Sequence, residues 1–390
     1  ARSGMARAMC FAVMLLAFTL PAPSACFTAT PISLRGHQLP KTSSPLQPQQ
    51  RVGPGIAVRT PAMRPLQMSE AGSATLPKAD VTAHLDFIQN VAAAPVVPDG
   101  KRLEVLARIV QSQGEDLIPP SQTKGVHPYV IPLSFNEIEG HVTGLLRTPD
   151  TNSDMAIVKS SSAGLELLAP SMDKFIKRAA IEADFYESRF AAEIVKAVQQ
   201  NGLIVDEGAA KAGKLGLERY VLVNVGAFPD LYEWLANDWL SKGKTEEALI
   251  TCSRASSLLT EWGKLHWVHS QTLSKVGGRE LEARDCARAC LQLPLWTSGA
   301  HIKDLVSVAD STMEKMATSY AKWAQTGGPE EDFVNEGLGP EQIAMGRARY
   351  LLDTVVVLPD DNSWDSVREQ LAKNLEEGGR PEMAKFVRGG

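Results

Sequence analysis

A glycine followed five residues later by an alanine occurs four times in the C-terminal half of this 390-residue chain. The four pairs are Gly243–Ala248, Gly278–Ala283, Gly339–Ala344 and Gly379–Ala384. A glycine ends a helix at a turn that side chains disfavour, and an alanine lets the next helix pack closely against the first. The recurring spacing therefore predicts helix–turn–helix units in this half of the chain.

The first two copies also share a longer pattern. They lie 35 residues apart, and at this offset Tyr232 aligns with Trp267 and Ala255 aligns with Cys290. A period of about 34 residues, with an aromatic residue in the first helix and a small residue in the second, resembles the tetratricopeptide (TPR) repeat. We therefore expect TPR-like helical hairpins over residues 223–390. The third and fourth copies are spaced irregularly, so an irregular all-helical bundle is the alternative.

The middle of the chain predicts a small antiparallel sheet. Four β-rich runs pair as two hairpins, Tyr129–Phe135 with His141–Arg147 and Met155–Lys159 with Leu165–Leu168. Pro132 predicts an edge strand or a bulge in the first run. Ser171 and the apolar spacing after it predict one long helix over 171–200. Residues 129–222 are thus expected to form a sheet with a long helix, preceded by helices and a linker over 69–128.

The predicted fold class is mainly α with a small antiparallel β unit (α+β). A further helix is expected over Ile302–Gln325. The composition, 44% hydrophobic and 22% charged, is that of a globular protein with a sizeable core, which excludes a wholly disordered chain.

The first 69 residues differ from the rest, because they contain seven Lys and Arg but no Asp or Glu. Residues 1–26 combine a basic residue with the twelve-residue apolar stretch Met9–Leu20, as in a signal peptide, and this stretch is too short to span a bilayer. Residues 27–68 are rich in Pro, Gln, Ser and Thr, as in plastid transit peptides. Together, with Phe27 at the junction, they resemble the bipartite presequences of algae with secondary plastids.

The predicted location is therefore the plastid, in the stroma or on the stromal side of the thylakoid, reached through a secretory-type signal. Plain secretion is the alternative. After the presequence the chain keeps three cysteines, Cys252, Cys286 and Cys290. An odd number without a framework pattern favours a reducing compartment over the secretory one.

A longer resemblance supports the same compartment. It rests on Pro128-Tyr129-Val130-Ile131-Pro132-Leu133 and Gly144-Leu145-Leu146-Arg147, followed by a helix and the TPR-like region. These stretches, with Lys275–Arg284 and Leu293–Thr297 in the tail, resemble a family of uncharacterised nuclear-encoded plastid proteins of plants and algae. The resemblance covers most of residues 125–390. It implies a plastid location and a helical-repeat form, and no biochemical activity.

Chemistry-bearing motifs are scarce. No G-x-S-x-G, H-E-x-x-H or G-x-G-x-x-G pattern occurs, so we predict no catalytic residue and no cofactor. After the first 69 residues, 33 basic residues face 45 acidic ones without a basic stripe, which disfavours nucleic acid as a partner. An enzyme or small-molecule-binding protein is the alternative, with a pocket between the 129–169 sheet and helix 171–200 near His127, His141 or Arg147.

One cluster could bind zinc. His266 and His269 share a helix face, as do Cys286 and Cys290, and a reversal at Gly277-Gly278 would bring the two pairs level. Cys290, however, occupies the position of Ala255 in the preceding copy, as a small buried residue would. We therefore predict no metal site and keep a zinc-stabilised helical module as a second alternative.

The predicted function is that of a non-enzymatic plastid scaffold with protein partners. Stacked helical hairpins offer an extended groove without reactive groups. On a TPR-like frame, the groove residues are Glu233, Asn237, Thr272 and Lys275. The expected partners are subunits of photosynthetic complexes during assembly or maintenance. No transmembrane segment is predicted after the presequence, and peripheral membrane association is compatible with the chain.

Overall fold

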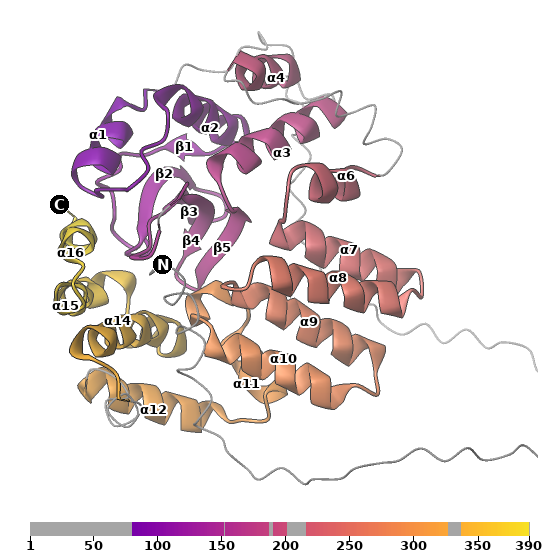
Figure 1. Ribbon diagram of the computed structural model, residues 1–390, viewed down its shortest axis with the longest axis vertical. Helices are drawn as coiled ribbons and strands as arrows, with labels where there is room; N and C mark the ends of the chain where they lie inside the picture. Colours follow the sequence, from indigo (N-terminus) through magenta and orange to yellow (C-terminus); the bar gives the residue numbers. More distant parts are fainter. Residues whose placement is uncertain (1–79, 152, 187–189, 201–215, 327–336, 390) are drawn as a thin grey trace, which may run out of the picture. The chain divides into compact units, whose positions relative to one another are not determined.

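The computed structural model describes residues 80–389, except for 152, 187–189, 201–215 and 327–336. The predicted signal peptide (1–26) and transit-peptide-like segment (27–68) lie outside the described residues. The described part is mainly helical and contains one small antiparallel sheet, which confirms the predicted fold class (Figure 1).

The sheet is a five-stranded antiparallel meander in the order β1-β2-β3-β4-β5. Its strands are β1 (Asp116–Leu117), β2 (Val130–Asn136), β3 (His141–Leu146), β4 (Ala156–Ser161) and β5 (Gly164–Ala169). The last four are the two predicted hairpins. β1 lies inside the predicted linker, and it pairs with β2 through Asp116 opposite Phe135. The register of β2 shifts between Pro132 and Ser134, so the proline is accommodated at a bulge.

Among its described residues, the same half of the chain contains the helices α1 (Thr82–Asn90), α2 (Gly100–Ser112), α3 (Met172–Phe185), α4 (Ala191–Gln200) and α6 (Leu217–Asn224). The Ser171 hydroxyl caps α3 as expected, accepting the Lys174 N–H at 3.3 Å. The single helix predicted over 171–200 is wrong. The chain leaves α3 at Phe185, and α4 packs against α2 and α3, which buries Ile194 and Val198.

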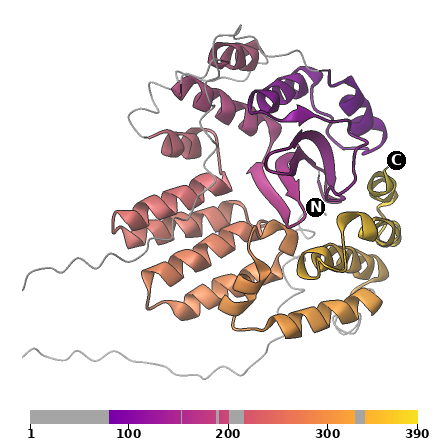
Figure 2. The same cartoon turned by 180° about the vertical axis from the view of Figure 1, so that it is seen from behind.

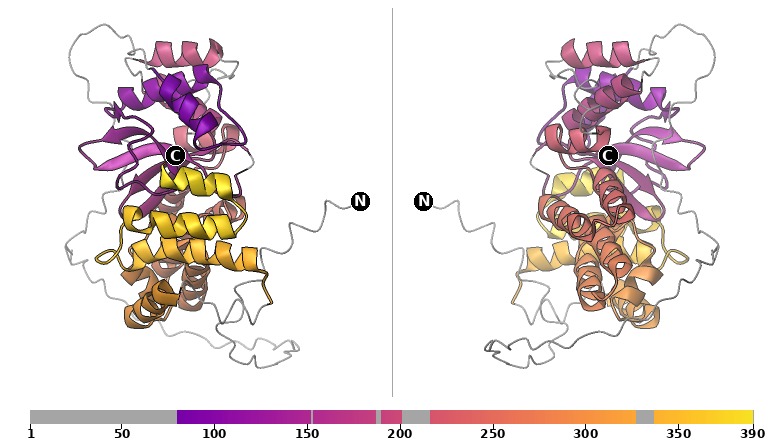
Figure 3. Two further views of the ribbon diagram at one scale, coloured as in Figure 1. Left: turned by 90° about the vertical axis from the view of Figure 1, so that its left-hand side faces the viewer. Right: turned by 90° about the vertical axis from the view of Figure 1, so that its right-hand side faces the viewer.

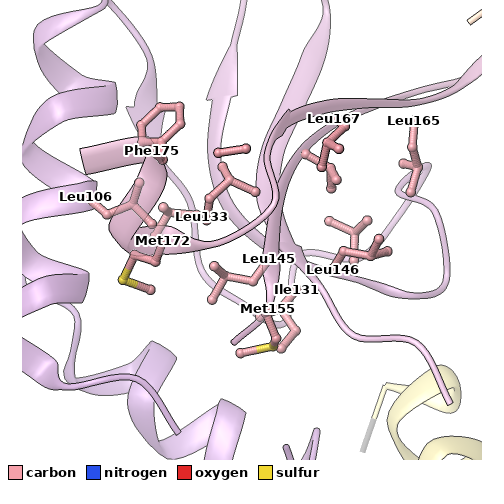
Figure 4. Packing of buried hydrophobic residues seen from close by; sticks show 14 of the residues in the cluster. Leu106, Ile131, Leu133, Leu145, Leu146, Met155, Leu165, Leu167, Met172 and Phe175 are labelled. Carbon is pink, nitrogen blue, oxygen red and sulfur yellow. The ribbon is translucent and has the colours of Figure 1, made fainter. Parts of the chain in front are cut away.

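Apolar side chains fill the space between the sheet and its helices. Leu106 of α2, together with Met172 and Phe175 of α3, packs with Leu133 and Leu145 of the sheet (Figure 4). The core is continuous with buried residues of the last helices, since the rings of Phe87 and Phe386 meet edge to face at 6.2 Å between centroids. The sheet and the C-terminal helices therefore share one hydrophobic core.

The second half, over the residues that the structure describes, is formed by helices and one short 3₁₀ turn. In chain order they are α7 (Pro229–Ser241), α8 (Thr245–Leu258), α9 (Gly263–Val276), α10 (Glu280–Gln292), η1 (Leu295–Thr297), α11 (Ile302–Val308), α12 (Met313–Thr326), α14 (Pro340–Val357), α15 (Trp364–Glu377) and α16 (Pro381–Arg388). The single helix predicted over Ile302–Gln325 is wrong. It is interrupted between α11 and α12, where Asp310 takes a φ of 60° that aspartate tolerates better than most residues.

The glycine–alanine pairs mark helical hairpins. Gly243, Gly278 and Gly379 have φ near +70° and lie between the packed pairs α7/α8, α9/α10 and α15/α16 (Figures 2 and 3). Gly339 instead occupies the N-cap of α14, which packs against α12 and α15. The paired alanines are almost completely buried, at 0–2% exposure: Ala248, Ala283, Ala344 and Ala384.

The 35-residue offset also has a structural counterpart. Tyr232 packs with Ala255 in one small cluster, and Trp267 packs with Cys290 in another. An aromatic residue of the first helix thus contacts a small residue of the second in both hairpins. Assignment of these hairpins to the TPR class stays a prediction. Among the described residues, no helix combines the length and the apolar character required to cross a membrane.

Candidate partner-binding surface

Three of the four predicted groove residues lie together on the neighbouring helices α7 and α9. The Lys275 ammonium donates to the Asn237 Oδ1 at 2.9 Å, and the Asn237 Nδ2 donates to the Glu233 carbonyl at 2.9 Å. Lys264, which sequence reasoning missed, forms an ion pair with Glu233 at 2.9 Å. We call Glu233, Asn237, Lys264 and Lys275 the α7/α9 surface.

Thr272, the fourth predicted groove residue, is 2% exposed and lies in the interior. Its hydroxyl donates to the Val268 carbonyl at 2.8 Å and accepts the Cys252 thiol at 3.4 Å. It stabilises the packing of α8 on α9 and is not available to a partner. Thr272 lies on α9, but the neighbouring helix α8 covers the side of α9 to which it belongs.

The α7/α9 surface combines one ion pair, one amide and one lysine that meets no carboxylate of the surface. The charges of Lys264 and Glu233 neutralise each other, whereas Lys275 meets an uncharged amide oxygen. Trp234 stands three residues before Asn237 on α7 and keeps 40% of its surface exposed. A positive charge, an amide and an exposed indole are groups that contact a polar or acidic peptide segment.

The four residues of the alternative zinc module, His266, His269, Cys286 and Cys290, are not brought together as a metal-binding group. Among the described residues, no group of three or more His, Cys, Asp or Glu side chains is arranged to hold a metal ion. The Cys290 thiol donates to the Gly263 carbonyl at 3.2 Å and is fully buried, as its alignment with Ala255 suggested. Burial raises the pKa of Cys290 to about 12 and that of Cys286 to about 11, which disfavours the thiolates that zinc requires. Burial also lowers the pKa of His266 and His269.

The residues named for the alternative pocket do not converge either. His141 begins β3 and Arg147 directly follows its last residue, so the two lie roughly 20 Å apart at about 3.3 Å per residue. His141 contacts the buried Glu115 carboxylate at 3.4 Å, and Glu115 also accepts the Ser134 hydroxyl at 2.6 Å. This carboxylate ties β1 to the next two strands. The face between the sheet and α3 is filled by the apolar core, so these polar groups serve the fold.

His127 lies at an aromatic junction that sequence reasoning did not find. Its ring centroid is 4.7 Å from that of Trp296 and 4.6 Å from that of Trp364. The Trp364 indole N–H donates to the Ser161 carbonyl at 2.8 Å. Burial lowers the pKa of His127 well below its usual value, and its Nδ1 accepts the Tyr129 N–H at 3.2 Å. A neutral imidazole thus joins the sheet to two distant helical segments.

Comparisons with known proteins divide the chain into three consecutive parts. Residues 82–224 match the family described as PAB N-terminal, residues 229–321 match the PAB middle domain, and residues 318–389 match the PAB C-terminal domain. The junction of His127, Trp296 and Trp364 therefore takes one aromatic residue from each part. No solved structure matches the chain.

A curated relative matches nearly the whole described region. It is the Arabidopsis thaliana protein named Protein IN CHLOROPLAST ATPASE BIOGENESIS, chloroplastic, which is 31% identical over 312 residues. The match covers 78% of this chain and 91% of the relative. With its three parts in order and this identity to a relative of similar length, the chain belongs to the PAB family.

Proposed function

We propose that the protein acts in the plastid as a non-catalytic factor in the biogenesis of a chloroplast ATPase. The observation that carries this proposal is the match to the Arabidopsis relative, whose name refers to chloroplast ATPase biogenesis and whose length is covered to 91%. The relative is also named chloroplastic, which supports import of this chain into the plastid. The acid-free composition of residues 1–69 supports the same location, with residues 1–26 and 27–68 as a two-step presequence.

The α7/α9 surface is the proposed contact with a protein partner. TPR-like hairpins place successive first helices side by side, so α7 and α9 share one face on which a peptide segment can lie. Within this surface Glu233 neutralises Lys264, whereas Lys275 contacts only the Asn237 amide oxygen. A carboxylate of the partner would complement the charge of Lys275. The proposed partner is an acidic segment of an ATPase subunit that is exposed before assembly.

A charge reversal tests this contact. Cells that lack the protein are complemented with the wild type, Lys275→Glu, Lys275→Arg or Lys315→Glu, and the amount of assembled chloroplast ATPase is measured on native gels. Lys315 is an exposed lysine of α12 and provides the matched control. We expect Lys275→Glu to weaken partner binding by about 1–3 kcal/mol and to reduce assembled ATPase several-fold. Lys275→Arg and Lys315→Glu are expected to restore it.

Two outcomes separate the parts of the proposal. If cells that lack the protein assemble normal amounts of the ATPase, the biogenesis role is wrong. If assembly requires the protein but Lys275→Glu restores it fully, the role stands and the α7/α9 surface is not the contact. Circular dichroism of the purified variants confirms that the charge reversal leaves the fold intact.

A further inference from the structure

A buried carboxyl group of the C-terminal part holds the 3₁₀ turn of the middle part. The Oδ1 of Asp353, on α14, accepts the Leu295 N–H at 2.7 Å, and the Trp296 N–H also contributes to this contact. Asp353 is 2% exposed. A helix side chain therefore caps η1 from a position 58 residues away in the sequence.

The turn that Asp353 holds connects two hydrophobic cores. Leu295 is fully buried in a cluster with Ile302 and Tyr320, whereas Trp296 packs into the core of the sheet next to His127. Consecutive residues of η1 thus enter different cores. Displacement of η1 would disturb both.

The same turn also positions α9. The Gly263 N–H, at the first residue of α9, donates to the Thr297 Oγ1 at 3.0 Å. The carbonyl of Trp296 lies against Gly164 of β5, where an added Cβ would come within 2.6 Å of it. η1 is therefore fixed on three sides, by α14, α9 and β5.

We propose that Asp353 is a pH-sensitive latch, whose neutral form keeps η1 closed between the two cores and whose ionisation favours local opening of η1. Opening would expose the carboxylate to water and loosen the start of α9, which carries Lys264 and Lys275. This inference goes beyond the proposed function, because it concerns the conformation of the chain and requires no partner.

The environment of Asp353 favours its neutral form while η1 is closed. Burial raises the pKa of Asp353 to about 7, against the opposing effects of Arg349 and of the Leu295 and Trp296 amides. The titratable and charged groups that act on Asp353 are Arg349 on its own helix and Tyr320 on α12. The turn η1 itself, Leu295–Thr297, contains no titratable side chain.

The direction in which pH changes the opening of η1 follows from the difference in the pKa of Asp353 between the closed and open states. In the closed state Asp353 titrates near pH 7, whereas an exposed Asp titrates near 3.8. Between these two pKa values, opening of η1 releases a proton from Asp353. The equilibrium constant for opening therefore rises with pH. From pH 6 to pH 8 the opening constant is expected to increase about tenfold and then to level off.

Hydrogen exchange measured by mass spectrometry tests the latch. Protection factors, corrected for the intrinsic pH dependence of exchange, are compared at pH 6 and pH 8 for the peptide that contains residues 293–300. The ratio of this protection to that of the β3 peptide is measured in the wild type, Asp353→Asn and Asp304→Asn. Asp304 is an exposed residue of α11 and serves as the control.

We expect the ratio to fall about tenfold from pH 6 to pH 8 in the wild type and in Asp304→Asn. In Asp353→Asn, which keeps a carbonyl oxygen for the Leu295 N–H but cannot ionise, the ratio is expected to stay constant. A wild-type ratio that does not change with pH overturns the proposal. So does an equal fall in Asp353→Asn. The pH dependence of the wild-type ratio can overturn the proposal by itself, so the test does not depend on the folding of Asp353→Asn.

Discussion

At the scale of single residues, Gly164 has the most restrictive environment at the contact between the sheet and η1. Its φ of +132° is one that other residues rarely adopt, and a Cβ built on it would lie 2.6 Å from the Trp296 carbonyl oxygen. Both the backbone conformation and the space therefore require glycine. Gly243 has a similar need for positive φ, but nothing lies within 4 Å of an added Cβ.

This difference predicts unequal costs for the same substitution. Gly164→Ala is expected to lower the free energy of unfolding by about 2–4 kcal/mol, because it adds strain and displaces η1. Gly243→Ala is expected to cost about 1 kcal/mol, from the backbone conformation alone. Urea denaturation of both variants measures the two values. Equal losses would contradict the close approach of η1 to β5.

The residue scale also shows what spacing alone could not reveal. On a TPR-like frame the sequence placed Glu233, Asn237, Thr272 and Lys275 in one groove, and the structure brings Glu233, Asn237 and Lys275 together but buries Thr272. The sequence could not identify Asp353 as a cap for Leu295, since that hydrogen bond joins residues 58 positions apart. No local pattern marks a carboxylate that caps a turn in another part of the chain.

At the scale of elements, the hairpins depend on the small residue that follows each turn. Ala248 of α8 has no exposed surface, and α8 packs on α7 and α9. Ser253, on the same helix, is exposed. The helices can approach closely only while the first position remains small.

Enlarging that position is expected to separate the helices. Ala248→Leu should reduce the free energy of unfolding by about 1–3 kcal/mol through overpacking. Ser253→Leu, the same new side chain on the outer side of α8, should change it by less than about 0.5 kcal/mol. Thermal unfolding followed by circular dichroism compares the two. A loss of the same size in both variants would show that α8 is not packed through this face.

Helix continuity was the element-scale feature that the sequence described least well. Apolar spacing runs on from α3 to α4 and from α11 to α12, so periodicity alone predicts two long helices. The chain nevertheless breaks after Phe185 and around Asp310. The breaks allow α4 to pack back on α2 and α3 and α12 to pack on α14, and this tertiary burial outweighs the local helical preference.

At the scale of the whole described region, the three PAB parts are joined by buried contacts. Arg368, in the C-terminal part, donates to the carbonyls of Thr123 and Val126 at 2.8 and 2.7 Å. In the N-terminal part, the buried Arg178 guanidinium forms an ion pair with the partly exposed Asp230 of the middle part at 2.6 Å. These contacts add to the shared hydrophobic core.

The three parts are therefore expected to unfold together. Tryptophan fluorescence reports on the middle and C-terminal parts, because all seven tryptophans lie after residue 233. The amide I infrared band of the strands reports on the sheet. In urea the two signals should give coincident transitions with one midpoint. A sheet signal that persists after the fluorescence change is complete would show that the N-terminal part folds independently.

The sequence by itself determined the fold class, the two hairpins of the sheet and the glycine-marked helix pairs. These features follow from local periodicity, turn chemistry and a repeated spacing. The tertiary structure alone decided where the long helical patterns break, that Thr272 is buried, and that η1 is held by Asp353 between two cores. Such features depend on contacts between residues far apart in the chain, and a desolvated carboxylate or a close backbone approach leaves no local pattern to read.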